Sequence, residues 1–348
     1  MNWGTVFNAL DKSKRWAHPR CFYLGCGFKF CWLFWFETQA AKTLLGSPLA
    51  YQMLFAFGQI TAYLLIAVFF KRKAPFSKNV VAVLLSYAIL LAGTILLTLQ
   101  TAITLAPLAW AVLVMVVTMA SAFTMILWLE IYACFPSRHS IQIYAESLFV
   151  SIVLWIVVSQ LPATTSSSIA CALPIALAIT WVLSWKETSE SVQPEKTEKL
   201  PSLPKTLMLW MGLVYFSFNF GYGLLGESWG TYTTAAGQAI PAALVVVGLT
   251  VFPQKFDFKT LGTLSLVFIT GGIALLYASF HGVATGVFMA AGREFCILLS
   301  YISICSAAYR NRISPAYCAA AVTIVGQTCN AVGYWVADSL VKAGGAAC

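Results

Sequence analysis

Charged side chains are scarce in this sequence. Only 9% of its 348 residues are Asp, Glu, Lys or Arg, whereas 60% are hydrophobic. A soluble globular domain carries about 25% charged residues, so a chain of this composition cannot cover its surface with side chains that favour water. The composition excludes a water-soluble protein. It predicts a protein whose partner is the lipid bilayer, with room for roughly ten to twelve transmembrane helices.

The patterns of several other protein classes are also absent. No two of the ten cysteines form a C-x-x-C pair, and there are only three histidines, so we predict no metal site. No P-loop, H-E-x-x-H or dinucleotide fingerprint occurs, so we predict no cofactor. Gly226–Gly230 fits G-x-S-x-G, but it lies between two apolar segments and not at the strand–turn–helix that a nucleophile elbow requires. We therefore expect that the protein is not an enzyme.

One long polar stretch, residues 186–205, interrupts the apolar sequence. It is rich in Glu, Lys and Pro, which predicts a solvated linker. Six apolar segments of membrane length precede it and five follow, and in lipid such segments satisfy their backbone as helices. The predicted spans are Tyr23–Leu44, Leu49–Phe70, Val80–Leu99, Leu105–Ala133, Ile141–Leu161, Ile169–Trp185, Thr206–Leu225, Thr231–Phe252, Leu261–Phe280, Val283–Ala308 and Tyr317–Val341.

Positive charge is distributed asymmetrically between the loops. Most of the 21 Lys and Arg residues lie before the first span or in alternate loops, whereas the other side has only Lys42 and Lys342. The positive-inside rule then predicts a cytoplasmic N-terminus and linker, in the inner (plasma) membrane of a bacterium. Because these basic residues set topology, the net charge of +9 does not indicate direct binding of nucleic acid by this chain.

The order of the segments resembles the major facilitator superfamily. The sequence predicts an N-terminal cytoplasmic segment (1–22), a six-helix bundle (23–185), the linker (186–205) and a second bundle (206–348). Eleven spans that start inside must end outside, so we expect the second bundle to have five helices, with the twelfth span missing. The resemblance implies two pseudo-symmetric bundles around a central site lined by the first, fourth, seventh and tenth helices. The loop FFKRKAPFSK departs from the family's motif, because it lacks the Gly and Asp that precede the basic residues.

A second resemblance is to membrane-bound transcriptional regulators of the LuxR type. LWLEIYACFPSRHSIQIYAES (residues 127–147) is similar to their junction between the fourth and fifth spans. A looser similarity to the sequence pattern of these regulators is found in three other segments: Tyr23–Phe36, Leu207–Gly226, and the eleventh span with Gly326 and Gly333. The resemblance implies a membrane sensor that binds DNA only through a C-terminal helix-turn-helix, which this chain lacks.

Charges inside spans are costly and are candidates for function by default. Arg293 and Glu294 lie about midway along the tenth span, and adjacent residues point about 100° apart on a helix. Either one faces a central cavity while the other pairs with a neighbouring helix, or both belong to a structural ion pair. Both hypotheses stay open at this point.

The first span carries Glu37 together with Lys29, Trp32 and Trp35. An acid flanked by aromatic rings suits a cationic or aromatic solute. Alternatively, Glu37 reaches water near the outer boundary while the tryptophans anchor the helix at the membrane interface.

Further candidates lie at the inner ends of the fourth and fifth spans and in the seventh. Glu130, Arg138 and Glu146 form either a gating charge cluster or, as is more common for such groups, structural ties between helix ends. In the seventh span, Asn219 and Tyr222 are predicted to line a cavity.

Two functions follow from these patterns. The first is the small-ligand sensor region of a LuxR-type regulator, which shifts the state of a cytoplasmic output domain. The alternative is a secondary transporter that couples a small solute to protons through Glu37 or Glu294. The predicted partners are the bilayer and an unknown small molecule.

Overall fold

The computed structural model describes residues 21–43, 48–70, 73–99, 103, 106–188, 193–195, 205–225, 231–251, 258–278 and 282–345. These residues are helical except for turns, connecting segments and one isolated bridge between Glu195 and Ile313. Most of the predicted N-terminal segment and most of the predicted linker lie outside them. The long helices are α2 (Cys26–Thr43), α3 (Pro48–Leu64), α4 (Val80–Thr98), α5 (Pro107–Tyr132), α6 (Ser137–Ser159), α7 (Ala163–Glu187), α8 (Lys205–Leu225), α9 (Thr231–Val251), α10 (Phe258–Tyr277), α11 (Val283–Asn311) and α12 (Ala316–Gly345).

Three short helical segments complete the secondary structure of the described residues. Two are 3₁₀ helices, η1 (Cys21–Gly25) and η3 (Phe76–Lys78). The third, η2 (Leu65–Phe69), continues α3 as a π-helix.

Each predicted span corresponds to one long helix. Nine of the helices within the described residues are long and apolar enough to cross a membrane. The prediction of an all-α, polytopic membrane protein with a six-plus-five arrangement is thereby confirmed. The differences are at helix ends: α7 begins at Ala163, six residues before its predicted start, and α12 continues to Gly345, four residues beyond its predicted end.

The chain divides into two compact units. The first unit comprises Met1–Ser202 and Tyr301–Ala320, and the second comprises Leu203–Ser300 and Ala321–Cys348. The C-terminal part of α11 and the start of α12 therefore belong to the same unit as the first six long helices.

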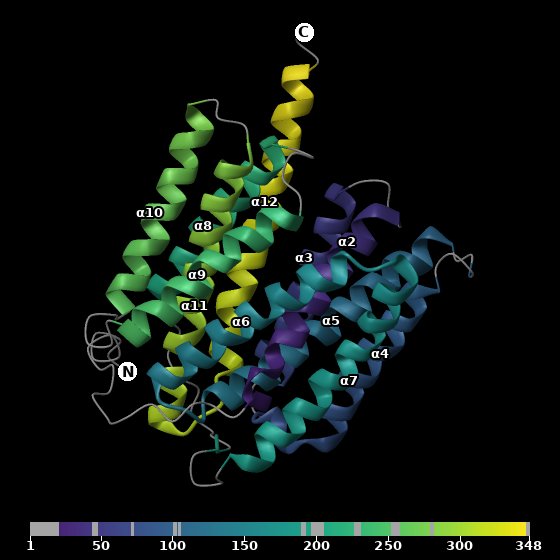
Figure 1. The fold of residues 1–348 in the computed structure, drawn as a ribbon, viewed down its shortest axis with the longest axis vertical. Helices are drawn as coiled ribbons and strands as arrows, with labels where there is room; N and C mark the ends of the chain where they lie inside the picture. The colour runs from purple at the N-terminus through teal and green to yellow at the C-terminus, as the bar shows by residue number, and fades with distance from the viewer. Residues whose placement is uncertain are drawn as a thin grey trace. The chain divides into compact units, whose positions relative to one another are not determined.

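In the first unit, α5 is a central packing element. Helices α3 and α4 both pack against α5, while α2 packs against α6 and α7 (Figure 1). The 26 residues of α5 contain no charge except Glu130, and most of them are buried. The largest fully buried side chains of the unit come from α2, α5 and α6, among them Trp32, Phe36, Trp128, Tyr132 and Tyr144.

In the second unit, small residues bring helix backbones close together. A Cβ atom on Gly333 of α12 would lie 2.6 Å from the carbonyl oxygen of Phe216 in α8, and one on Gly237 of α9 would lie 2.8 Å from the carbonyl oxygen of Val287 in α11. Without a hydrophobic effect between helices in lipid, such close packing is a main source of association.

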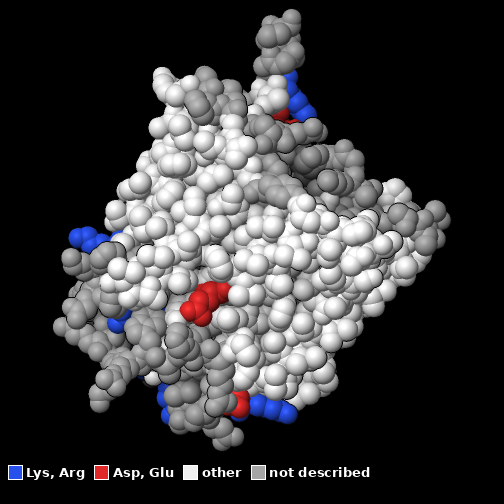
Figure 2. All heavy atoms as spheres, viewed as in Figure 1, with Lys and Arg blue, Asp and Glu red and all other residues white. Residues whose placement is uncertain are grey.

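The outward faces of the helices are apolar. On α4, Val80, Val81, Leu84 and Leu85 are all more than half exposed. Figure 2 shows a broad surface without charged side chains over the region where Figure 1 draws α4 and α7. In water such a surface would be an aggregation hazard, whereas in a bilayer it is the expected lipid-facing surface.

Candidate functional site

Glu130 of the first unit is a buried charge with four hydrogen-bond donors around it. It lies in the last turn of α5 and is completely buried. Its Oε1 accepts hydrogen bonds from the Phe76 backbone N–H (3.0 Å) and the Ser314 hydroxyl (2.6 Å). Its Oε2 accepts from the Ser77 backbone N–H (2.8 Å) and the Ser77 hydroxyl (2.6 Å). Four neutral donors thus satisfy a buried carboxylate without a cation among these contacts.

The sequence around η3 explains why donors are available there. Phe76 and Ser77 open the 3₁₀ helix, so their N–H groups have no partner within it, and an acidic group at a helix start complements both these donors and the dipole. The next helix is capped locally, because the Asn79 side chain accepts from the Ala82 N–H (3.2 Å). The loop between α3 and α4 is therefore held by α5.

The connection between α11 and α12 joins the same network. Ser314 donates to Glu130 and also accepts from the Ala316 N–H at the start of α12 (3.2 Å). Arg312 adopts a positive φ of 52° and forms an ion pair with Glu195 (2.7 Å). The hydroxyls of Ser137 in α6 and Ser306 in α11 share a hydrogen bond (2.5 Å). Glu130 is thus the point at which the α3–α4 loop, α5 and the α11–α12 connection meet. We call this arrangement of Glu130, Phe76, Ser77 and Ser314 the carboxylate clasp.

Glu130, Arg138 and Glu146, predicted to form a gating cluster or ties between helix ends, lie at the end of α5 and in the first half of α6. The four contacts of Glu130 come from other residues, and Glu146 accepts a hydrogen bond from Gln142 on its own helix (2.6 Å). Arg138 lies in the first turn of α6 and is half-buried.

The candidate residues of α2 lie inside the first unit. Trp32 is fully buried and its indole N–H donates to the Thr94 hydroxyl of α4 (2.8 Å), while Trp35 is 3% exposed. Neither ring therefore has the exposure of an interface anchor. Glu37 is half-buried. Lys29 is 5% exposed, lies 5.5 Å from the ring centre of Phe30 and forms no ion pair among the described residues.

The candidates of α8 and α11 form one cluster in the second unit. The Arg293 guanidinium lies over the ring of Phe218, 3.9 Å from its centre, and the Arg293 Nε has no hydrogen-bond partner. Phe218 packs with Met289 and Ala290, and Tyr222 packs against this group from the next turn of α8. Arg293 forms no ion pair within the part of the chain that the structure describes. We call Arg293, Phe218, Tyr222, Met289 and Ala290 the arginine–aromatic cluster.

Asn219 and Glu294 flank this cluster on the same helices. Asn219 is 3% exposed and its side-chain amide donates to the Tyr215 carbonyl one turn earlier (3.1 Å). Glu294 is 2% exposed on α11. Adjacent in sequence, Arg293 and Glu294 do not pair with each other. The sequence singled out Arg293, Asn219 and Tyr222 separately. It gave no signal for Phe218, because a phenylalanine in an apolar span is unremarkable until a cation lies on it.

Other sequence motifs contribute no site. Gly226–Gly230 lies outside the described residues. Among the residues that the structure does describe, no three His, Cys, Asp or Glu side chains are grouped so that they could hold a metal ion.

The sequence and the structure were compared with those of known proteins. No protein-family model matches the sequence, and no curated protein matches it. Among solved structures, the chain is similar to a point variant of the E. coli fucose:proton symporter, with a TM-score of 0.51 over 93% of this chain and 92% of that chain. The chain therefore has a fold similar to that of this symporter, in agreement with the predicted major-facilitator-like arrangement of helices. At 13% identity the similarity shows the fold alone. It gives no support to the resemblance to LuxR-type regulators.

Proposed function

We propose that this multi-pass membrane protein is a secondary transporter of a small solute, with its N-terminus in the cytoplasm of a bacterial cell. The fold supports this function over that of a regulator, since the structural neighbour is a solute:proton symporter. The single observation that carries the proposal within this chain is the arginine–aromatic cluster. In it a half-buried cation, which has no ion pair among the described residues, lies on α11, the tenth long helix in chain order. In the superfamily that this order of helices resembles, the tenth helix lines the solute site.

The chemistry of the cluster favours a solute with an acidic group. A guanidinium offers donors in a planar fork that matches a carboxylate or phosphate, and its Nε has no partner. The rings of Phe218 and Tyr222 supply apolar contact beside it. Lys29 of α2 is buried and has no ion pair among the described residues, so both units contain positive charge within apolar helices.

Proton coupling requires a carboxylate that exchanges protons during the cycle. Glu294 and Glu37 are the candidates, because each lies within a helix predicted to line the solute path. We expect Glu294→Gln to abolish accumulation driven by a proton gradient while leaving solute exchange across the membrane intact, since exchange needs no net proton movement.

Uptake into proteoliposomes tests the proposal. Radiolabelled lactate, gluconate and fucose serve as two acidic probes and one neutral probe, with an inward proton gradient imposed. We expect saturable uptake of an acidic probe that is lost in Arg293→Ala and retained in Arg310→Ala, a control that removes an exposed arginine from the same helix. Uptake of fucose alone would refute an acidic solute. Uptake unaffected by Arg293→Ala would refute the cluster as the solute site.

A sensor would behave differently in the same preparation. A probe that raises the melting temperature in an Arg293-dependent way, with no uptake of any probe at any gradient, would favour ligand sensing without transport. That result would favour the sensor region of a LuxR-type regulator over a transporter.

A further inference from the structure

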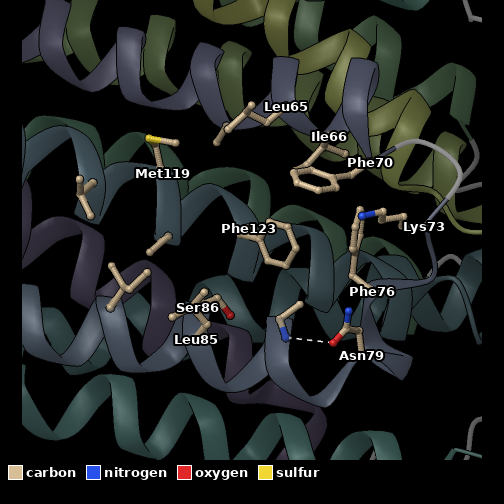
Figure 3. A pocket seen from close by; sticks show the side chains of 15 residues that line it. Leu65, Ile66, Phe70, Lys73, Phe76, Asn79, Leu85, Ser86, Met119 and Phe123 are labelled. Carbon is tan, nitrogen blue, oxygen red and sulfur yellow. Dashed lines mark hydrogen bonds between the residues drawn. The ribbon is translucent and has the colours of Figure 1, made fainter.

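A groove of about 380 Å³ lies within the first unit, between α3, α4 and α5 (Figure 3). Its volume falls in the range of about 300–1,000 Å³ that small-molecule sites occupy. Nearly all of its lining is apolar. The polar exceptions are Ser86, Asn79 and Lys73.

The groove arises from the way the three helices pack. Helices α3 and α4 each pack against α5, so α5 forms the floor and the other two form the walls. Each helix contributes a single face, as shown by the spacing Ala82, Leu85, Ser86 and Ile89 on α4, with Phe123 on the floor. The same spacing recurs in the floor residues Val116, Met119, Ala120 and Phe123.

The wall on the α3 side changes its helical form beside the groove. Here α3 widens into the π-helix η2, closed by a hydrogen bond from the Phe70 N–H to the Leu65 carbonyl (3.0 Å). π-Helical turns are rare and frequently occur at functional sites. Leu65, Ile66 and Phe70 of this turn point into the groove (Figure 3).

Asn79 and Lys73 lie at one end of the groove, whereas Ser86 lies along α4 and forms a hydrogen bond within its own helix. The Ser86 hydroxyl donates to the Val83 carbonyl (2.8 Å), and the Asn79 side-chain oxygen caps α4. Among the described residues of the lining, Lys73 alone is charged. It lies at the end of the groove beside Phe70 and Phe76, with its Nζ 5.3 Å from the ring centre of Phe70 (Figure 3).

The length of the groove matches one leaflet of a bilayer. From Asn79 to Ile89 the lining of α4 extends over ten residues, or about 15 Å at 1.5 Å per residue. The hydrocarbon core of a membrane is about 30 Å thick, so about 15 Å is half of it. The groove also opens to the lipid side, because Leu85 lines it and is 57% exposed.

We propose that this groove binds an anionic phospholipid of the leaflet on the Lys73 side, with one acyl chain between α3 and α4 and the phosphate at the Lys73 ammonium. Two features of the groove match this occupant. Its apolar part is one leaflet long and suits an acyl chain, and the Lys73 cation at its end suits an anionic headgroup. A soluble solute fits less well, because it would have to enter sideways through the acyl chains. The proposal does not depend on transport.

Lipid titration of the purified full-length protein tests the headgroup contact. Delipidated protein in detergent is titrated with dioleoyl phosphatidylglycerol or dioleoyl phosphatidylcholine, and the first bound lipid is quantified by native mass spectrometry. One lysine near a lipid phosphate is worth about a fivefold change in affinity. We therefore expect Lys73→Gln to weaken phosphatidylglycerol binding about fivefold. It should weaken phosphatidylcholine binding less, because the choline cation offsets the charge of the same phosphate. The control Lys259→Gln removes an exposed lysine of the second unit and should change neither.

Filling the groove tests the acyl-chain contact independently. Ala82 lines the wall of α4, so Ala82→Leu should abolish the first binding step for both lipids. Ala88→Leu is the matched control, because Ala88 is exposed on the same helix and does not line the groove.

Three results would overturn the proposal. The first is an equal effect of Lys73→Gln and Lys259→Gln, which would show unspecific surface charge. The second is unchanged lipid binding in Ala82→Leu with native thermal stability. The third is competition by soluble glycerol 1-phosphate at the concentration of the lipid, which would assign the mouth to a free anion.

Discussion

Replacing Glu130 by glutamine tests whether the carboxylate clasp holds the first unit together. Glutamine has the shape of glutamate, but one of its two terminal atoms is a donor. In the native protein each carboxylate oxygen accepts from one backbone N–H and one serine hydroxyl. A hydroxyl can rotate and accept from the new amide, whereas a backbone N–H cannot. Whichever way the amide turns, the N–H of either Phe76 or Ser77 faces a second donor.

The expected cost follows from this single conflict. A buried N–H without an acceptor costs about 1–3 kcal/mol, and the bonds that remain are no longer made to a charged acceptor. The variant also avoids burying a charge, which acts in the opposite direction. We therefore expect Glu130→Gln to lower the free energy of unfolding by about 2 kcal/mol. For a unit of about 200 residues this corresponds to a fall in Tm of about 4–8 °C.

Thermal unfolding with a maleimide fluorophore measures this change, because the chain supplies its own reporters. Cys26, Cys134 and Cys305 are buried and become reactive only on unfolding. Glu146→Gln is the matched control, since its amide oxygen can keep the bond from Gln142, and it should stay within about 0.5 kcal/mol of the native protein. A Glu130→Gln variant with an unchanged or higher Tm would refute the clasp as a stabilising contact.

Other predictions concern packing and thiol reactivity. Gly333→Ala places a Cβ 2.6 Å from the Phe216 carbonyl oxygen, whereas the Cβ of Gly282→Ala would have no atom within 4 Å. We expect the first variant to lower the free energy of unfolding by about 1–3 kcal/mol and the second to leave it unchanged. Both are measured as Tm in the same assay. Burial raises the pKa of the Cys134 thiol to about 12, so at pH 8 only about one thiol in 10⁴ is ionised. The thiolate fraction therefore rises only as pH approaches that pKa. Native protein treated with N-ethylmaleimide at pH 8 should be modified at the exposed Cys21 and not at Cys134, as peptide mass spectrometry can show; rapid modification of Cys134 would contradict its burial.

The helices could be predicted from hydropathy because in lipid a spanning segment can form its backbone hydrogen bonds only within itself, as a helix. A span must satisfy its own N–H and C=O groups, so an apolar segment of sufficient length specifies a helix without knowledge of its neighbours. The grouping of residues 301–320 with the first unit could not be predicted in this way. It depends on single contacts between distant positions, such as Ser137 with Ser306 and Glu130 with Ser314, which are 169 and 184 residues apart.

For the candidate site too, some residues could be predicted from the sequence and others could not. A charge in an apolar span is conspicuous, so Glu130, Arg293 and Glu294 could be selected from the sequence. Their partners could not, because a buried carboxylate is satisfied by neutral donors as well as by a cation.

Opposite charges that are close in sequence therefore did not determine the pairing. Glu130 contacts serines and backbone N–H groups of two loops, and Arg293 lies over Phe218 although Glu294 is its neighbour in the chain. On a solvated surface, a charged side chain can pair with the nearest opposite charge, because such an ion pair costs little to form and contributes little. Inside an apolar bundle each charge must be desolvated, so the residues that already face it on adjacent helices decide how it is satisfied. The environment of a charge in a span is thus determined by the uncharged residues around it: Phe218 for Arg293, and Ser314 for Glu130.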